Sequence, residues 1–74
     1  MRIMDLLKAE IGKEYRISRI DTRDEELTNF LFTLGCYSGE PITVVARRNS
    51  GVFLAIKDGR YTVDARLAQA IVVE

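Results

Sequence analysis

The sequence predicts a small, mainly β domain. About five short strands curl into a partly open barrel, and a helix is inserted between the first and second strands. Turn signals built on glycine, asparagine or proline recur about every ten residues along the 74-residue chain. The segments between these turns are short and mostly rich in β-branched residues. One segment has the apolar spacing of an amphipathic helix.

The whole chain, residues 1–74, is expected to form a single domain. Its composition is 47% hydrophobic and 30% charged. A chain of this size buries only roughly 60% of the surface that its unfolded form exposes. Most of the large apolar side chains are therefore needed for the core, and few remain to line an active-site cavity.

The first predicted elements are a short helix and a strand. Residues 3–10 can place their apolar side chains on one helical side, and Gly12 follows as a helix-terminating glycine. In residues 14–20 apolar and polar side chains alternate at first, which predicts a strand. The alternation fails at Arg19 and Ile20, so we expect a bulge or bend there.

The strongest helix signal begins at Thr22. Thr22 and Glu25 have the spacing of a capping box, in which each side chain accepts a hydrogen bond from the backbone N–H of the other residue. Gly35 is expected to end the helix. The apolar stripe at helical spacing comprises Leu27, Phe30, Leu31 and Leu34.

The remainder of the chain predicts sheet. Residues 42–48 and 52–57 are expected strands, and Asp58-Gly59 is the expected two-residue loop of a hairpin. In that register Ile56 pairs with Tyr61. Because side chains alternate between the two faces of a strand, one face of the hairpin is apolar and is expected to be core. The side chains on that face are Leu54, Ile56, Tyr61 and Val63.

Phe53 then points away from the core. Asp64 is expected to cap a short turn through residues 65–68, and residues 71–73 are the final strand. A sheet of this size favours an SH3-like barrel, with an OB-like barrel as the alternative, since both use five strands.

The composition argues against most kinds of chemistry. The formal net charge is zero, whereas domains that coat nucleic acid are strongly basic, so we expect no nucleic-acid partner. The chain has no histidine, the commonest general base and metal ligand. Cys36 is the single cysteine and has no base to activate it, so we predict a buried small side chain rather than a nucleophile. No pair of groups makes a plausible nucleophile and base, so we expect no enzyme.

No cofactor or metal site is expected either. Phosphate-binding glycine motifs are absent from the sequence. The acidic cluster of residues 21–26 lacks the spacing of a calcium loop and is interpreted as a solvated helix start. No apolar run approaches the roughly 18 residues of a membrane span, and charges interrupt the N-terminal apolar residues. We therefore expect a cytoplasmic location.

Two segments resemble a known family. Residues 34–44, LGCYSGEPITV, are similar to the LGL-x-x-G-x-x-[IV]-x-V motif of the FeoA family, the small ferrous iron transport protein A. Residues 68–73, AQAIVV, resemble that family's closing A-x-x-I-x-V. Cys36 stands where the family usually has a larger apolar residue, and the turn at residues 49–51 lacks the prolines often found there.

This resemblance implies a cytoplasmic, non-enzymatic SH3-like barrel that works with the membrane transporter FeoB, whose cytoplasmic part binds GTP. The alternative is a metal-dependent regulator fragment resembling the C-terminal SH3-like domain of iron-dependent repressors. Association of the chain with copies of itself stays open. Four residues are predicted to lie on the docking surface: Tyr37, Arg47, Arg48 and Phe53. Arg47 and Arg48, with Lys57 and Arg60 on a neighbouring strand, are expected to form a basic patch.

Overall fold

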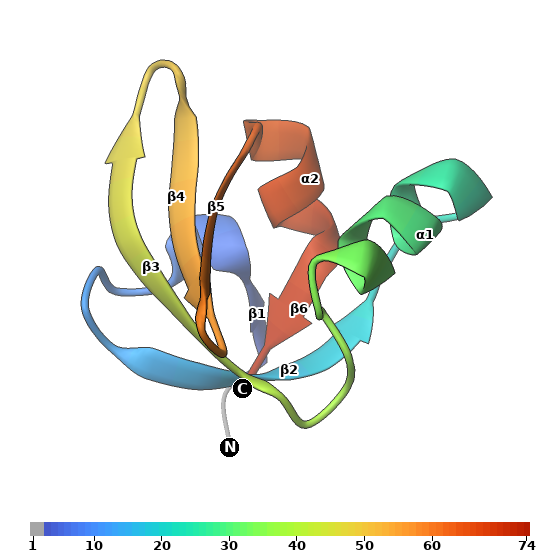
Figure 1. Cartoon of the computed structure of the whole chain (residues 1–74), viewed down its shortest axis with the longest axis horizontal. Coiled ribbons are helices and arrows are strands. Elements are labelled where there is room, and N and C mark those ends of the chain that lie inside the picture. The colour runs from blue at the N-terminus through green and yellow to red at the C-terminus, as the bar shows by residue number, and fades with distance from the viewer. Residues whose placement is uncertain (1–2) are drawn as a thin grey trace.

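The sheet has six strands in the order β1-β6-β2-β3-β4-β5, and every neighbouring pair is antiparallel. The computed structural model describes residues 3–74. Figure 1 shows the sheet strongly curved, with α1 set to one side of it. The elements are β1 (Met4–Asp5), η1 (Leu6–Lys8), β2 (Glu14–Ile20), α1 (Glu25–Thr33), β3 (Pro41–Arg48), β4 (Gly51–Ile56), β5 (Gly59–Val63), α2 (Ala65–Ala70) and β6 (Ile71–Val73).

This arrangement confirms the predicted barrel of short strands with a helix inserted between two of them. The helix lies between β2 and β3, which are the first and second of the predicted strands. The sixth strand, β1, was not predicted. It has only two residues and exists because Met4 and Asp5 pair with Val73 and Val72 of β6.

The predicted helix over residues 3–10 is wrong. Between β1 and β2 the helical structure is limited to the single 3₁₀ turn η1. The Asp5 carboxylate caps this turn and accepts a hydrogen bond from the Leu7 N–H at 3.0 Å. Gly12 does not end a helix. It has φ +86° and lies in the turn before β2, where its N–H donates to the Val44 carbonyl at 2.8 Å. Sheet pairing at both ends of this segment outweighs its weak helical preference.

Strand β2 has the predicted bounds and the predicted irregularity. Its pairing with β6 shifts between Ile17 and Arg19, so the bulge lies one residue before the first position where the alternation fails. A bulge of this kind bends the strand. The bend lets β2 pair with β6 at one end and with β3 at the other.

Helix α1 forms as predicted but with a different cap. The N-cap is Asp24, whose Oδ1 accepts from the backbone N–H groups of Glu26 and Leu27 at 3.0 and 3.3 Å. Thr22 Oγ1 instead accepts from the Asp24 N–H at 3.1 Å, so the Thr22–Glu25 capping box does not form. The carboxylate of Asp24 is a stronger acceptor than a hydroxyl and lies two residues closer to the helix.

The apolar stripe of α1 is buried only in part. Leu27 and Leu31 are buried and Leu34 is half-buried, whereas Phe30 is 47% exposed. Gly35 ends the helix as predicted, with φ +95°. Its N–H donates to the Phe32 carbonyl and the next N–H, of Cys36, donates to the Leu31 carbonyl, which is the Schellman pattern.

The β4–β5 hairpin forms with a register that differs from the prediction. Ile56 pairs with Gly59 and Leu54 with Tyr61, so the loop is Lys57-Asp58, and Lys57 takes the positive φ of 53°. The shift in pairing is two residues. Because two is the period of a strand, every side chain keeps its predicted face.

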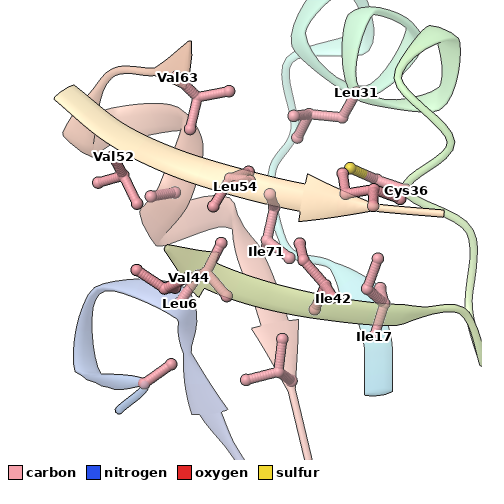
Figure 2. Packing of buried hydrophobic residues seen from close by; sticks show 14 of the residues in the cluster. Leu6, Ile17, Leu31, Cys36, Ile42, Val44, Val52, Leu54, Val63 and Ile71 are labelled. Carbon is pink, nitrogen blue, oxygen red and sulfur yellow. The ribbon is translucent and has the colours of Figure 1, made fainter. Parts of the chain in front are cut away.

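The core therefore contains the predicted hairpin face. Leu54, Ile56 and Val63 are buried and Tyr61 is half-buried against them. Asp64 caps α2 through its Oδ1, which accepts from the Leu67 N–H at 2.8 Å, and α2 extends two residues beyond the predicted turn. Figure 2 shows side chains from β3, β4 and β6 meeting in the interior: Ile42, Val44, Leu54 and Ile71, with Leu31 of α1 and Cys36 at one end.

Candidate protein-docking surface

The structure does not bring the four predicted docking residues together. Arg48 and Phe53 are neighbours at the β3–β4 hairpin, where the Arg48 guanidinium carbon lies 5.8 Å from the centroid of the Phe53 ring. The backbone register explains this contact. Phe53 pairs with Ala46, and Arg48 lies two residues further along β3 on the same face.

Arg47 is exposed but faces the opposite side of β3. Its Nη1–H donates to the carbonyl of Ala9 at 2.6 Å, which ties β3 to the residue that follows η1. Because neighbouring strand residues point to opposite faces, Arg47 cannot share a surface with Arg48. Arg47 is held by this hydrogen bond on the side of the sheet that covers the N-terminal segment.

Tyr37 belongs to a separate patch, which we call the aromatic patch and which comprises Phe32, Tyr37 and Lys57. The rings of Phe32 and Tyr37 stack with their centroids 5.2 Å apart and 13° between their planes. Lys57 Nζ lies 5.9 Å from the centroid of the Tyr37 ring and 3.7 Å from a carboxylate oxygen of Glu40. Phe32 is 38% and Tyr37 48% exposed.

The aromatic patch lies near the opposite end of strands β3 and β4 from Arg48. Ile42 pairs with Ile56, next to the loop that carries Lys57, whereas Arg48 pairs with Gly51. Six residues of strand separate these two positions, roughly 20 Å. Phe32 was missed from the sequence because it falls outside the apolar stripe of α1, and no sequence signal indicated its contact with Tyr37.

A shallow groove of about 350 Å³ crosses the outer face of the β3–β4–β5 sheet. We call it the outer groove. Its floor is the half-buried ring of Phe53, flanked across the strands by the small side chains of Ala46 and Thr62. Val45, the extra residue of a bulge between Val44 and Ala46, is 40% exposed beside it. The residues lining it include Val45, Ala46, Arg48, Phe53, Arg60 and Thr62.

The predicted basic patch is therefore divided. Lys57 contacts Glu40 and Tyr37, and Arg47 is bound to the Ala9 carbonyl. Arg48 and Arg60 remain and both line the outer groove. Within residues 3–74 neither of these two arginines makes an ion pair with a carboxylate.

Cys36 lies in the core, where none of its surface is exposed. Burial raises the pKa of its thiol to about 11, because the thiolate would lose its hydration. The thiol is thus protonated at neutral pH and out of reach of a substrate. The prediction of a small buried side chain is confirmed.

The acidic residues at the start of α1 have local roles. Asp24 caps the helix, and Asp21 lies 3.9 Å from the Arg19 guanidinium. No group of three or more His, Cys, Asp or Glu side chains that could hold a metal ion occurs in the part of the chain that the structure describes. None of the helices between residues 3 and 74 has the length and apolar character needed to cross a membrane.

Comparison with known proteins gives consistent matches. A family model described as the FeoA domain matches residues 4–74. A crystal structure of an iron uptake regulatory protein, FeoA, superposes with a TM-score of 0.89 at 16% identity, covering 100% of this chain and 97% of that one. FeoA of Stenotrophomonas maltophilia in complex with zinc, described as a procaryotic SH3 domain protein, superposes with a TM-score of 0.85 at 17% identity, covering 96% and 89%.

A manganese-dependent transcriptional repressor also superposes, with a TM-score of 0.87 at 25% identity. The match covers 96% of this chain but only 40% of the repressor. A search of curated protein sequences found no match. These structures establish the SH3-like fold and exclude the OB-like alternative. Since the family model spans all but the first three residues, the chain belongs to the FeoA family.

Proposed function

We propose that this chain is an accessory protein of ferrous iron transport that docks on the cytoplasmic GTP-binding domain of the membrane transporter FeoB. The observation that carries the proposal is the match of the FeoA family model to residues 4–74. Membership of this family supports an accessory, non-catalytic role in ferrous iron transport. Docking would bias the nucleotide or gating state of the transporter through contacts that differ between those states.

The surface of the barrel supports a role in protein binding. Its interior is filled by aliphatic side chains, the Cys36 thiol and the ring of Tyr15, and none of its buried side chains is polar or charged among the residues described. We assign contact with the partner to two outer features that hold the predicted docking residues Tyr37, Arg48 and Phe53: the aromatic patch and the outer groove. Exposed aromatic and arginine side chains are the residue types that most often dominate the energy of protein interfaces.

The four predicted docking residues thus contribute to different degrees. Tyr37 acts through the aromatic patch, and Arg48 and Phe53 act through the outer groove. Arg47 contributes least, because its guanidinium is already bound to the Ala9 carbonyl. The protein is proposed to work in the cytoplasm, to need no cofactor and to bind no nucleic acid.

A pull-down tests this proposal directly. The intact chain, immobilised through a C-terminal tag, should retain the purified GTP-binding domain of FeoB in the presence of GDP or of a GTP analogue. Tyr37→Ala and Arg48→Gln should each reduce the retained amount. Arg23→Gln, an exposed change at the start of α1, is the matched control and should retain as much as the unaltered chain. Absence of retention with either nucleotide would contradict the proposal.

A second candidate function is a metal-dependent regulatory domain, favoured by the superposition on the manganese-dependent repressor. Calorimetric titration of the chain with Mn²⁺ and Fe²⁺ distinguishes the two functions. Micromolar binding to the chain alone would favour the regulatory role. Retention of the FeoB domain without such binding supports the transport role.

A further inference from the structure

We infer that the outer groove binds an extended acidic peptide segment of the partner, in which two carboxylates flank an apolar side chain. This inference rests on the proposed function, because it assigns the chemistry of the partner at the Arg48 and Phe53 surface. It goes further in naming the recognised pattern, which is acidic–x–apolar–x–acidic.

The positive charges that line the outer groove favour an anionic partner. Arg48 and Arg60 line it, and within residues 3–74 neither makes a hydrogen bond or an ion pair through its guanidinium. Arg16 and Arg19 do find partners, since Arg16 donates to the Gly39 carbonyl at 2.9 Å and Arg19 lies near Asp21. Arg23 and Arg66 have no such partner within residues 3–74, but neither lines the outer groove. The planar guanidinium binds a carboxylate through two parallel N–H groups, which makes a carboxylate the matching ligand.

The spacing of the groove sets the spacing of the ligand. Arg48 lies beside Gly51 and Arg60 beside Ala55, and Phe53 lies midway between these two positions of β4. Arg48 and Arg60 lie on the strands at either side of β4, so they are separated by roughly 13 Å along the strands and roughly 10 Å across them, about 16 Å on the diagonal. Residues i to i+4 of an extended peptide laid obliquely across the strands span roughly 13 Å, and the long arginine side chains cover the remainder. In such a peptide residues i, i+2 and i+4 face the same side, so two carboxylates reach the arginines while the middle side chain rests on Phe53.

The groove fits this occupant better than a nucleic acid or a second copy of the chain. Two arginines line it, and of its two half-buried aromatic residues only Phe53 lies on the outer face, since Tyr61 packs against the core. Tight nucleic-acid binding uses many phosphate contacts and several stacking rings. The chain has carboxylates four residues apart only at Glu10 with Glu14 and Asp21 with Glu25, and their middle residues are Gly12 and Arg23. Neither segment supplies the apolar side chain.

The test is a titration of the full ¹⁵N-labelled chain with the blocked peptide GESFSEG, followed by NMR. Resonances of β3, β4 and β5 on the outer face should shift, and those of the aromatic patch should not. The matched peptide GQSFSQG should bind roughly tenfold more weakly, since two exposed ion pairs are lost. The double variant Arg48→Gln, Arg60→Gln should show the same loss, and Arg23→Gln should bind like the unaltered chain.

Several results would overturn the inference. Equal binding of the two peptides would show that the carboxylates are not recognised. Shifts confined to other elements would place the site elsewhere. Tighter binding of oligothymidine at the same resonances would indicate a nucleic-acid site, and slower tumbling without peptide would indicate that a second copy covers the groove.

The FeoB pull-down separates this inference from the proposed function. If Arg48→Gln, Arg60→Gln loses both the peptide and the FeoB domain, both proposals are supported. If that variant still retains the FeoB domain while the peptide is lost, docking uses another surface and the partner assignment is wrong. If neither peptide binds but the FeoB domain is retained, the inference fails and the proposed function stands.

Discussion

A single methyl group added at Gly51 should destabilise this barrel, because it would meet the backbone of the neighbouring strand. Gly51 begins β4 with φ +147°, a conformation that L side chains rarely adopt. A Cβ built there would lie 2.8 Å from the carbonyl oxygen of Val63 and 3.0 Å from Cγ2 of Thr62. The oxygen belongs to the backbone of β5, so relief of the contact requires β5 to move away from β4.

The expected cost of Gly51→Ala has two parts. A residue held in a sparsely populated backbone region costs about 1–3 kcal/mol, and forcing an extra methyl group into a packed site typically costs about 1–3 kcal/mol. We therefore expect a loss of about 2–6 kcal/mol in the free energy of unfolding. For a domain of this size that corresponds to a fall in Tm of at least roughly 8 °C.

Gly39→Ala is the matched control for Gly51→Ala. Gly39 has φ +88° but no atom within 4 Å of an added Cβ, so only backbone strain of about 1–2 kcal/mol is expected. Thermal unfolding followed by far-UV circular dichroism, with urea titration for the free energy, measures both variants. A Tm for Gly51→Ala no lower than that for Gly39→Ala would refute the argument that the contact with Val63 controls this position.

Three further predictions test the helix and the core. Asp24→Ala removes the carboxylate that caps α1 and should lower the free energy of unfolding by about 0.5–2 kcal/mol in urea titration, whereas Thr22→Ala should lower it less. A larger loss for Thr22→Ala would indicate that Thr22 is the cap and that the Thr22–Glu25 capping box forms. Leu31→Ala should lose about 2–5 kcal/mol because the side chain is fully buried, while Phe30→Ser should stay within about 0.5 kcal/mol, and equal losses would contradict the observed burial. The pKa of Cys36 is about 11 in the fold and 9.0 in the unfolded chain. As the pH rises the unfolded chain therefore loses the thiol proton first, so the free energy of unfolding should fall by about 1–3 kcal/mol between pH 9 and 11. The difference between the unaltered chain and Cys36→Ala isolates this effect, and a constant difference over that range would show that the thiol does not titrate differently on folding.

Much of the secondary structure could be predicted from local patterns. The bounds of β2 and of β6 agree with the prediction, β3 begins one residue earlier than predicted, and β4 begins and ends one residue earlier. The hairpin register was wrong by two residues, yet Leu54 was still assigned to the core. Alternation in a strand determines the face of a side chain whatever residue it pairs with, so this error did not change which side chains were assigned to the core.

The errors arose where two local signals competed or where no local signal exists. Thr22 and Asp24 are both good capping residues, and only the start of the helix at Glu25 decides between them. Strand β1 is defined by its hydrogen bonds to β6, nearly 70 residues away in the chain, which no periodicity in a two-residue segment can reveal.

Local patterns in the sequence were enough to predict which strand faces are apolar and which family the chain resembles. The first follows from side-chain alternation and the second from two short motifs, and both are local properties. The neighbours of the surface residues emerged only from the folded chain: Arg48 and Arg60 share a groove with Phe53, Arg47 is bound on the other face, and Tyr37 stacks on Phe32. Such neighbours depend on strand register and on a bulge at Val45, which are set by the packing of the whole barrel rather than by any single segment.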